Sequence, residues 1–107
     1  MKRGDVVVAA LPGDLGKPRP AVIVQSDIFA ATPTITLVPI TSSVIDNNLF
    51  RLTVSPTPEN GLHNLSQLMT DKITTISRQK VGKIVGALDL ATIQAMNTQL
   101  AIFIGIA

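Results

Sequence analysis

The chain lacks cysteine, tryptophan and tyrosine altogether, and it has one histidine, His63, among 107 residues. Without cysteine, neither a disulfide nor a thiolate metal site can form. The sequence therefore does not indicate whether the protein resides in an oxidising or a reducing compartment. A single histidine, a single glutamate and scattered aspartates do not supply the closely arranged ligands of a structural zinc site. We therefore expect no bound metal.

Other catalytic motifs are missing as well. His63 follows Gly61 in a segment without a patterned serine, so a histidine triad is excluded and we expect an exposed loop histidine. The chain has neither a Gly-x-Gly-x-x-Gly pattern nor a P-loop, and we expect no cofactor. No apolar run approaches the ~18 residues of a membrane span. A cytoplasmic protein without membrane attachment is the expectation.

Charged residues are scarce. They make up 15% of the chain, where about 25% is typical of soluble domains, whereas apolar residues make up 46%. A small domain buries a lower share of its surface, so apolar surface will be left over. A two-fold homodimer is the commonest way to cover it. The formal net charge of +2 is compatible with nucleic acid binding but does not demand it.

Apolar and β-branched patterns predict a mainly β fold in a single domain, residues 1–107. Segment 19–25 is apolar nearly throughout, which is typical of a central strand. Segment 49–54 alternates as an edge strand does. Other extended segments are predicted over residues 6–10, 34–40, 65–77 and 81–85.

One helix is predicted after Asp89, which is a good helix cap. Apolar residues follow it near helical spacing: Leu90, Ile93, Met96, Leu100 and Phe103. A single helical turn capped by Ser26 and Asp27 is predicted over residues 28–31, and a short turn over residues 77–80. The expected architecture is a small barrel of five to seven short strands, closed by one C-terminal helix.

An arginine between two prolines leads into the apolar segment 19–25. Proline fixes φ near −65° and biases the preceding residue toward extended backbone, so a stiff segment presents Arg19. The N–H groups of a guanidinium suit a phosphate. A hydroxyl cluster that begins with Thr41 and Ser42 ends the strand predicted over 34–40. Guanidinium and hydroxyls on adjacent strand ends would form a small anion site.

Further candidate binding residues carry charge, amide or hydroxyl groups: Lys17, Ser42, Gln67, Asp71, Lys72 and Arg78. Each residue of the site also has a structural interpretation. Arg19 could form a surface ion pair with Asp14 or Asp71, which would contribute little. Thr41 could bond its own backbone at the strand end. The hypothesis of a site depends on their joint placement.

Chemistry without a metal or a histidine favours a substrate that brings its own nucleophile. RNA does so through its 2′-hydroxyl. Arg19 could stabilise charge on the phosphorus-centred transition state, and Thr41 could orient a non-bridging oxygen. Because a guanidinium is a poor base, Asp71 is the candidate proton acceptor. Such cleavage leaves a 2′,3′-cyclic phosphate and a 5′-hydroxyl.

The chain resembles the MazF/PemK family of toxin ribonucleases in four segments that occur in the family's order: 3–7 (Arg-Gly-Asp-Val-Val), 18–25 (Pro-Arg-Pro-Ala-Val-Ile-Val-Gln), 39–42 (Pro-Ile-Thr-Ser) and 68–76. The resemblance implies a homodimeric SH3-like barrel and metal-independent, sequence-specific cleavage of single-stranded RNA. It implies that Arg19 and Thr41 are catalytic and that Asp71 lies on the substrate surface. It also implies a type II toxin, neutralised by an acidic antitoxin whose disordered tail folds on binding.

Two other hypotheses remain open. Segments 24–28 and 68–71 and the ending Ile104-Gly105-Ile106 resemble CcdB, which implies a gyrase poison acting through its C-terminal helix. The third hypothesis is an inactive domain that only binds an acidic partner. It is favoured by the shortage of aromatic residues, because only Phe29 and Phe50 are expected to be available for base stacking.

Overall fold

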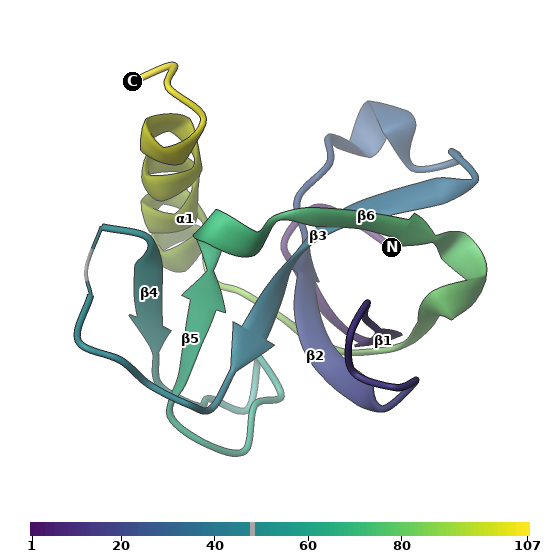
Figure 1. The fold of residues 1–107 in the computed structure, drawn as a ribbon, viewed down its shortest axis with the longest axis horizontal. Helices are drawn as coiled ribbons and strands as arrows, with labels where there is room; N and C mark the ends of the chain where they lie inside the picture. Colours follow the sequence, from purple (N-terminus) through teal and green to yellow (C-terminus); the bar gives the residue numbers. More distant parts are fainter. Residues whose placement is uncertain (48) are drawn as a thin grey trace.

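The computed structural model describes residues 1–47 and 49–107, in which seven strands and one helix are formed (Figure 1). The strands are β1 (Asp5–Ala10), β2 (Pro18–Ile23), β3 (Thr34–Thr41), β4 (Arg51–Val54), β5 (Ser66–Met69), β6 (Thr74–Ser77) and β7 (Val81–Ala87). Three single 3₁₀ turns connect strands: η1 (Asp27–Phe29), η2 (Thr70–Lys72) and η3 (Arg78–Lys80). The helix α1 (Leu90–Phe103) follows β7.

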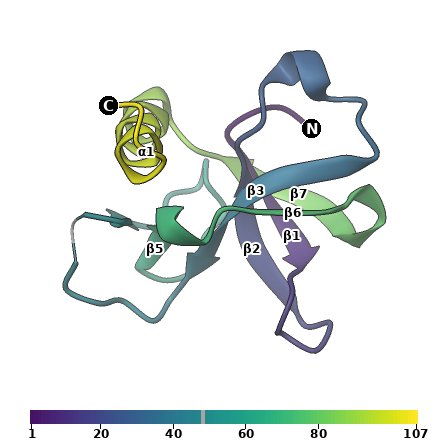
Figure 2. The ribbon, with the colours of Figure 1, turned by 45° about the horizontal axis from the view of Figure 1, so that its top comes forward.

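The strands form an antiparallel sheet in the order β4-β5-β3-β2-β1-β7, and β6 pairs with β3 beside this path. The prediction of a mainly β fold with one C-terminal helix is confirmed, as are the interior place of β2 and the edge place of β4. The strands β4 and β7 stand at the two ends of this order, and they do not pair with each other in the described residues. Strand pairing therefore does not close the sheet into a barrel. The strand β3 connects two parts of the sheet, since its first half pairs with β6 and its end pairs with β5 (Figure 2).

Two apolar clusters line the two faces of the central strands. Successive side chains of a strand point to opposite faces. Val6 and Val22 therefore join the cluster that packs against Met96 of α1, whereas Val7 and Leu37 join the cluster on the other face. Burial on both faces explains why these strands are apolar nearly throughout.

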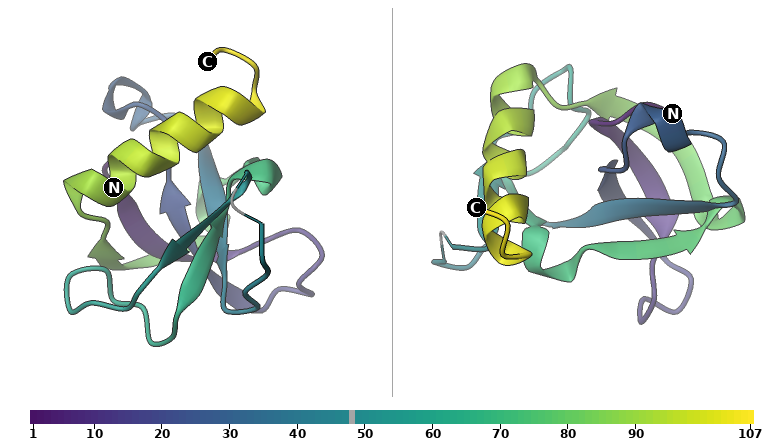
Figure 3. Two further views of the ribbon diagram at one scale, coloured as in Figure 1. Left: turned by 90° about the vertical axis from the view of Figure 1, so that its left-hand side faces the viewer. Right: turned by 90° about the horizontal axis from the view of Figure 1, so that it is seen from above.

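The helix begins where the sequence predicts. The carboxylate of Asp89 accepts a hydrogen bond of 2.8 Å from the backbone N–H of Thr92. The helix contacts β4 and η2 and lies to one side of the sheet (Figure 3). None of the helices in the described residues is long and apolar enough to cross a membrane.

The predicted apolar stripe of α1 is only partly buried. Met96 and Leu100 are buried and Ile93 packs against the same cluster, but Leu90 and Phe103 are exposed. Both exposed residues are terminal residues of the helix, at its first and last positions. The stripe therefore continues into uncovered apolar surface at the C-terminal end of α1.

The segment 65–77, predicted as one extended stretch, is divided into β5 and β6 by the turn η2. Thr70 explains the break, because its side chain is fully buried. Its hydroxyl bonds the carbonyl oxygen of Phe50 at 2.9 Å and the amide oxygen of Gln99 at 3.2 Å. These long-range bonds turn the chain between the strands. The short turns predicted after Ser26 and over 77–80 are confirmed as η1 and η3.

Candidate active site

Arg19 and Thr41 lie on two strands that part at the edge of the sheet. The register of β2 and β3 begins at the pair Ala21 and Pro39, and Arg19 and Thr41 each lie two residues beyond this pair. At this point β3 pairs with β5 instead of β2. The start of β2 and the end of β3 therefore diverge, as the lower edge of the molecule in Figure 1 shows.

A groove of about 500 Å³ lies between these strand ends. Val8, Ile40 and Val85 contribute apolar surface to it. Its polar and charged lining comes from several segments: Asp14, Arg19, Thr41, Ser42, Ser43, His63, Asn64 and Ser66. The structure thus brings together the guanidinium and the hydroxyl cluster that the sequence analysis selected.

Arg19 is held loosely in this groove. Its Nε atom lies 3.7 Å from Oδ2 of Asp14, and half of its side chain is exposed. This is one of the two ion pairs that the sequence suggested. An exposed pair contributes about 0–1 kcal/mol to stability. A phosphate, which accepts two parallel hydrogen bonds from a guanidinium, can therefore replace the carboxylate at little cost.

Thr41 keeps a hydrogen to donate. Its Oγ1 accepts a hydrogen bond of 3.0 Å from the backbone N–H of Ser43, as the structural interpretation of this residue predicted. That bond uses a lone pair of the oxygen, and a hydroxyl has both a donor hydrogen and acceptor capacity. The same residue can therefore shape the turn and donate to an anion in the groove. Ser42, between them, is exposed and also lines the groove.

Gln67 is buried, and its side chain holds the loop that follows the groove residue Thr41. Its side-chain amide accepts from the backbone N–H of Ile45 at 3.0 Å and donates to the carbonyl of Ile45 at 2.8 Å. It also donates to the hydroxyl of Thr53 at 3.1 Å. Gln67 was predicted to bind RNA. The structure instead places it where it anchors the loop that follows Thr41.

Two other predicted residues lie outside the groove. Asp71 faces Arg51 at 3.4 Å between Oδ1 and Nε, and neither atom has another hydrogen-bond partner. Arg78 donates from Nε to the carbonyl of Thr32 at 2.9 Å and from Nη2 to the carbonyl of Ala30. Both side chains hold turns in place, and the structure does not bring them to Arg19.

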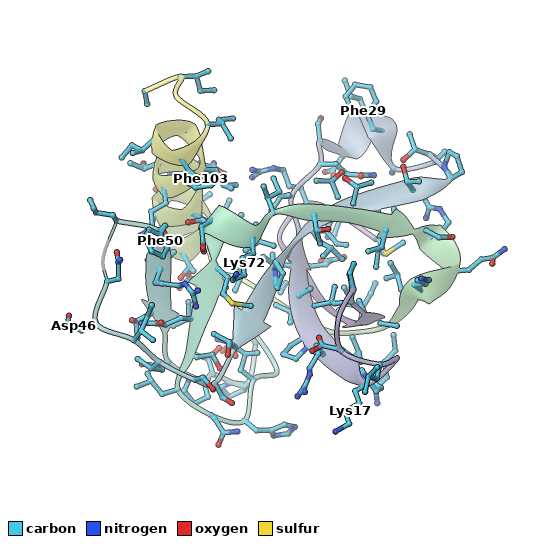
Figure 4. The ribbon with its side chains drawn as sticks, in the orientation of Figure 1. Lys17, Phe29, Asp46, Phe50, Lys72 and Phe103 are labelled. Atoms are coloured by element: carbon cyan, nitrogen blue, oxygen red, sulfur yellow. The ribbon has the colours of Figure 1, made fainter. Side chains whose placement is uncertain are left out.

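The two predicted lysines are exposed and far apart in the view of Figure 4. Lys17 lies in the loop between β1 and β2, two residues before Arg19, while Lys72 lies on η2. Of the two candidate stacking residues, Phe50 lies under the guanidinium of Arg51, with 5.7 Å from Cζ to the ring centre. Phe29 is at the opposite end of the molecule from Lys17 in this view. Neither phenylalanine lines the groove.

The sequence analysis missed one residue of the groove. His63 is exposed, as predicted, but it lines the groove beside the strand ends. A signal was present, because His63 lies three residues before β5, and β5 pairs with the end of β3 that carries Thr41. In the described residues, no group of three or more histidine, cysteine, aspartate or glutamate residues is arranged to hold a metal ion.

Comparison with known proteins identifies the class to which this fold and groove belong. A family described as "PemK-like, MazF-like toxin of type II toxin-antitoxin system" matches residues 2–104. The chain therefore belongs to this family. It is 44% identical over 108 residues to a "Probable endoribonuclease MazF" of Mycolicibacterium smegmatis, an alignment that covers all of this chain and 99% of the relative.

Solved structures confirm the fold. An endoribonuclease in complex with its cognate antitoxin, from a mycobacterial species, superposes with a TM-score of 0.82 at 23% identity, over 100% of this chain and 97% of that one. The toxin MazF-mt6 of Mycobacterium tuberculosis gives 0.82 at 22% identity, over 96% and 98%. A MazE-MazF structure from Deinococcus radiodurans gives 0.80 at 14% identity, over 100% and 97%.

Proposed function

We propose that this protein is the toxin of a type II toxin–antitoxin pair and cleaves single-stranded RNA as an endoribonuclease in the cytoplasm. Its family and the name of its relative of 44% identity support the class of activity. The observation that carries the proposal is that Arg19 and Thr41, from the ends of two neighbouring strands, line the same groove. The groove has the positive charge and the hydroxyl donor that a phosphodiester needs.

The proposed reaction requires no metal, because the substrate supplies its nucleophile. The 2′-oxygen forms a bond to phosphorus, and the bond from phosphorus to the 5′-oxygen breaks. Arg19 stabilises the charge that develops on the non-bridging oxygens, and Thr41 donates a hydrogen bond to one of them. The products are a 2′,3′-cyclic phosphate and a 5′-hydroxyl.

The proton of the 2′-hydroxyl needs an acceptor within the groove. Asp71, the acceptor that the sequence suggested, is paired with Arg51 outside the groove. Asp14 lines the groove and already lies 3.7 Å from Arg19. We therefore assign the acceptor role to Asp14. When a phosphate displaces it from Arg19, its carboxylate is left beside the reacting group.

We expect the antitoxin to cover the same groove. Two of the similar structures are toxins solved with their antitoxins, "Endoribonuclease in complex with its cognate antitoxin" and "MazE-MazF". An acidic, disordered tail would gain hydrogen bonds from the exposed side chains of Arg19 and Lys17 as it folds on binding. RNA and antitoxin should therefore compete. Simultaneous binding without mutual weakening would contradict this arrangement.

A second copy of the chain is expected on the apolar face beside the C-terminal end of α1. A second hollow of about 480 Å³ lies there, lined in part by Phe29, Ile73, Ile104 and Ile106, which are all exposed. Charged residues form only 15% of the chain, so this face has few charges to keep it hydrated. Ile104→Asp should shift the protein from dimer to monomer in sedimentation velocity.

The test of the activity is incubation of the purified protein with a single-stranded RNA transcript in EDTA. The wild type should cut it at defined sites, and Arg19→Ala should leave it intact. Lys80→Gln, an exposed change on η3, is the matched control that removes one positive charge elsewhere. Sequencing the new 5′ ends gives the recognised motif. Equal survival of RNA with wild type and Arg19→Ala would show that the proposal is wrong.

The gyrase hypothesis is tested with the same samples. It requires the ending that includes Gly105 and Ile106, so deletion of residues 105–107 should abolish toxicity if it holds. Toxicity that persists in the deletion variant and disappears in Arg19→Ala supports the nuclease and removes the gyrase poison. Loss of toxicity in the deletion variant alone, with RNA cleavage retained by that variant, would favour the gyrase poison.

A further inference from the structure

The only histidine of the chain lines the same groove as Arg19 and Thr41. Arg19 comes from β2 and Thr41 from β3, whereas His63 comes from the connection between β4 and β5. Three segments distant in sequence thus contribute to one groove. A histidine in such a place is a candidate for proton transfer, because imidazole is the side chain whose charge changes near neutral pH.

The connection that carries His63 is held from inside by a buried asparagine. Asn60 is 4% exposed. Its side-chain oxygen accepts from the backbone N–H groups of Thr57 and Leu62, both at 3.0 Å, and its side-chain nitrogen donates to the carbonyl of Ser55 at 3.0 Å. These bonds fold the connection into a fixed turn immediately before His63.

The same turn also packs closely against β7. Gly61 has a φ of +69°, and a Cβ atom at this position would lie 2.2 Å from the carbonyl oxygen of Val85. Leu62 packs against the core cluster beneath α1. The residue before His63 is therefore anchored in the core, and His63 is presented to the groove on a rigid support. Groups placed this way are suited to chemistry that requires defined geometry.

The titratable groups that face His63 across the groove are few. The loop after β1 contributes Asp14 and β2 contributes Arg19, while the lining residues of β1, β3, β5 and β7 carry no titratable side chain. A carboxylate has no proton to give at neutral pH, and a guanidinium does not release its proton in the working range. Of the side chains lining the groove in the described residues, His63 alone is an imidazole, the type of side chain that serves as a proton donor in catalysis most often.

We infer that His63 is the general acid of the cleavage reaction and protonates the leaving 5′-oxygen; this inference rests on the proposed function. As the 2′-oxygen attacks phosphorus, its proton passes to the carboxylate of Asp14. As the bond from phosphorus to the 5′-oxygen breaks, the imidazolium of His63 gives its proton to that oxygen. The imidazole then regains a proton from water, and the proton on Asp14 returns to solvent, so the enzyme is restored.

A substrate with a better leaving group tests this role. The probe is an oligonucleotide that contains the mapped cleavage site, made once with the normal 5′-oxygen and once with sulfur at that bridging position. A thiol ionises near pH 8.5, so a thiolate departs without a proton donor. The proteins compared under single-turnover conditions are wild type, His63→Asn, and the control Glu59→Gln, which changes an exposed residue of the same connection outside the groove.

His63→Asn should lower the rate on the oxygen substrate by about 10²–10⁴-fold, the range of general acid catalysis, and leave the rate on the sulfur substrate within about threefold of wild type. Glu59→Gln should match wild type on both substrates. Equal melting temperatures confirm that each variant is folded.

The outcomes separate this inference from the proposed function. If wild type and Arg19→Ala both leave RNA intact, the proposed function fails and this inference fails with it. If the wild type cleaves RNA, the proposed function holds. His63 is then not the general acid if His63→Asn is unimpaired on the oxygen substrate, or if it is impaired equally on the oxygen and sulfur substrates. An equal loss on both substrates would assign His63 to binding or positioning.

Discussion

The guanidinium of Arg19 meets the carboxylate of Asp14 at 3.7 Å, across the mouth of the groove. The two residues are five positions apart, and the intervening loop contains Leu15 and Gly16 in the left-handed region, at φ values of +53° and +79°. This loop turns Asp14 back toward Arg19. In the free protein, the guanidinium proposed to bind phosphate is therefore paired with a carboxylate until an anion displaces that carboxylate.

Replacement of Asp14 separates binding from chemistry. In Asp14→Asn one negative charge leaves the groove, so attraction for RNA phosphates should rise and KM should fall several-fold at low salt. The proposed proton acceptor is lost at the same time, so kcat should fall by about 10²-fold. Steady-state kinetics on a short RNA check both effects. A rise in kcat would contradict the acceptor role.

Replacement of Thr41 isolates its hydroxyl. Thr41→Val keeps the branched shape and removes the donor, and we expect kcat to fall by about 10²-fold because a transition-state hydrogen bond is lost. Thr41→Ser keeps the hydroxyl and should retain most of the activity. Melting temperatures should change little in either variant, since the bond from Ser43 is exposed. Comparable activity of the valine and serine variants would exclude Thr41 from catalysis.

Arg51 and Asp71 predict an effect on stability. Only 11% of the Arg51 side chain and 20% of the Asp71 side chain are exposed, and the two facing atoms have no other hydrogen-bond partner. Arg51→Ala should lower the free energy of unfolding by about 2 kcal/mol, less than a fully buried pair because part of Asp71 remains hydrated. Urea unfolding measures this change.

The matched control for this pair is the double variant Arg51→Met with Asp71→Leu. It removes both charges and keeps apolar volume, so most of the lost stability should return. Activity on RNA should survive in the control, because neither residue lines the groove. A double variant as unstable as Arg51→Ala would show that the charge left behind is not the cause.

Asp89 predicts a dependence of stability on pH. Hydrogen bonds from the side chain and then the backbone of Thr92 lower the pKa of Asp89 from its ordinary value of 3.8. Because the folded value is the lower one, the contribution to stability is complete above pH 3.8 and is lost as pH falls through the folded value. Asp89→Ala should lower the melting temperature at neutral pH, with a smaller difference from wild type in acid.

The serine variant checks the origin of this effect. Asp89→Ser keeps an oxygen acceptor for the N–H of Thr92 but has no carboxylate to titrate. Its melting temperature should exceed that of Asp89→Ala at neutral pH and should lack the contribution that wild type loses in acid. Circular dichroism in the far ultraviolet follows the unfolding. An unchanged acid profile in both variants would assign the titration to another carboxylate.

Substitution of Gly61 should show how strongly stability and activity depend on the turn that carries His63. In Gly61→Ala the new methyl group meets the carbonyl oxygen of Val85 at 2.2 Å, so the turn must move as well as adopt an unfavourable φ. Gly13→Ala is the control, since its φ is +85° with nothing within 4 Å. The control should lose about 1 kcal/mol of unfolding free energy, and Gly61→Ala distinctly more, together with activity. Equal losses would show that the close approach is unimportant.

The sequence predicted the features that depend on neighbouring residues. The cap at Asp89, the apolar run of β2 and the stiff presentation of Arg19 are local, and the structure contains the helix and strands where these signals place them. It did not predict the break of 65–77, because the hydroxyl of Thr70 finds its partners at Phe50 and Gln99, which are distant in sequence.

The same limit applies to the site. Two strand ends that carry Arg19 and Thr41 follow from strand pairing, so this part of the groove could be predicted. The placement of Asp71 against Arg51 and of His63 in the groove depends on how the β4–β5 connection folds back. That path is set by Asn60, a buried polar residue whose partners no periodic pattern reveals.

The paired hydrogen bonds between Gln67 and Ile45 act as a clamp on the segment that leaves β3. Gln67 lies opposite Thr41 in the pairing of β5 with β3, so its bonds to the N–H and the C=O of Ile45 tie the segment after Thr41 to the neighbouring strand. The shape of this segment therefore depends on a side chain of β5 as well as on β3 itself.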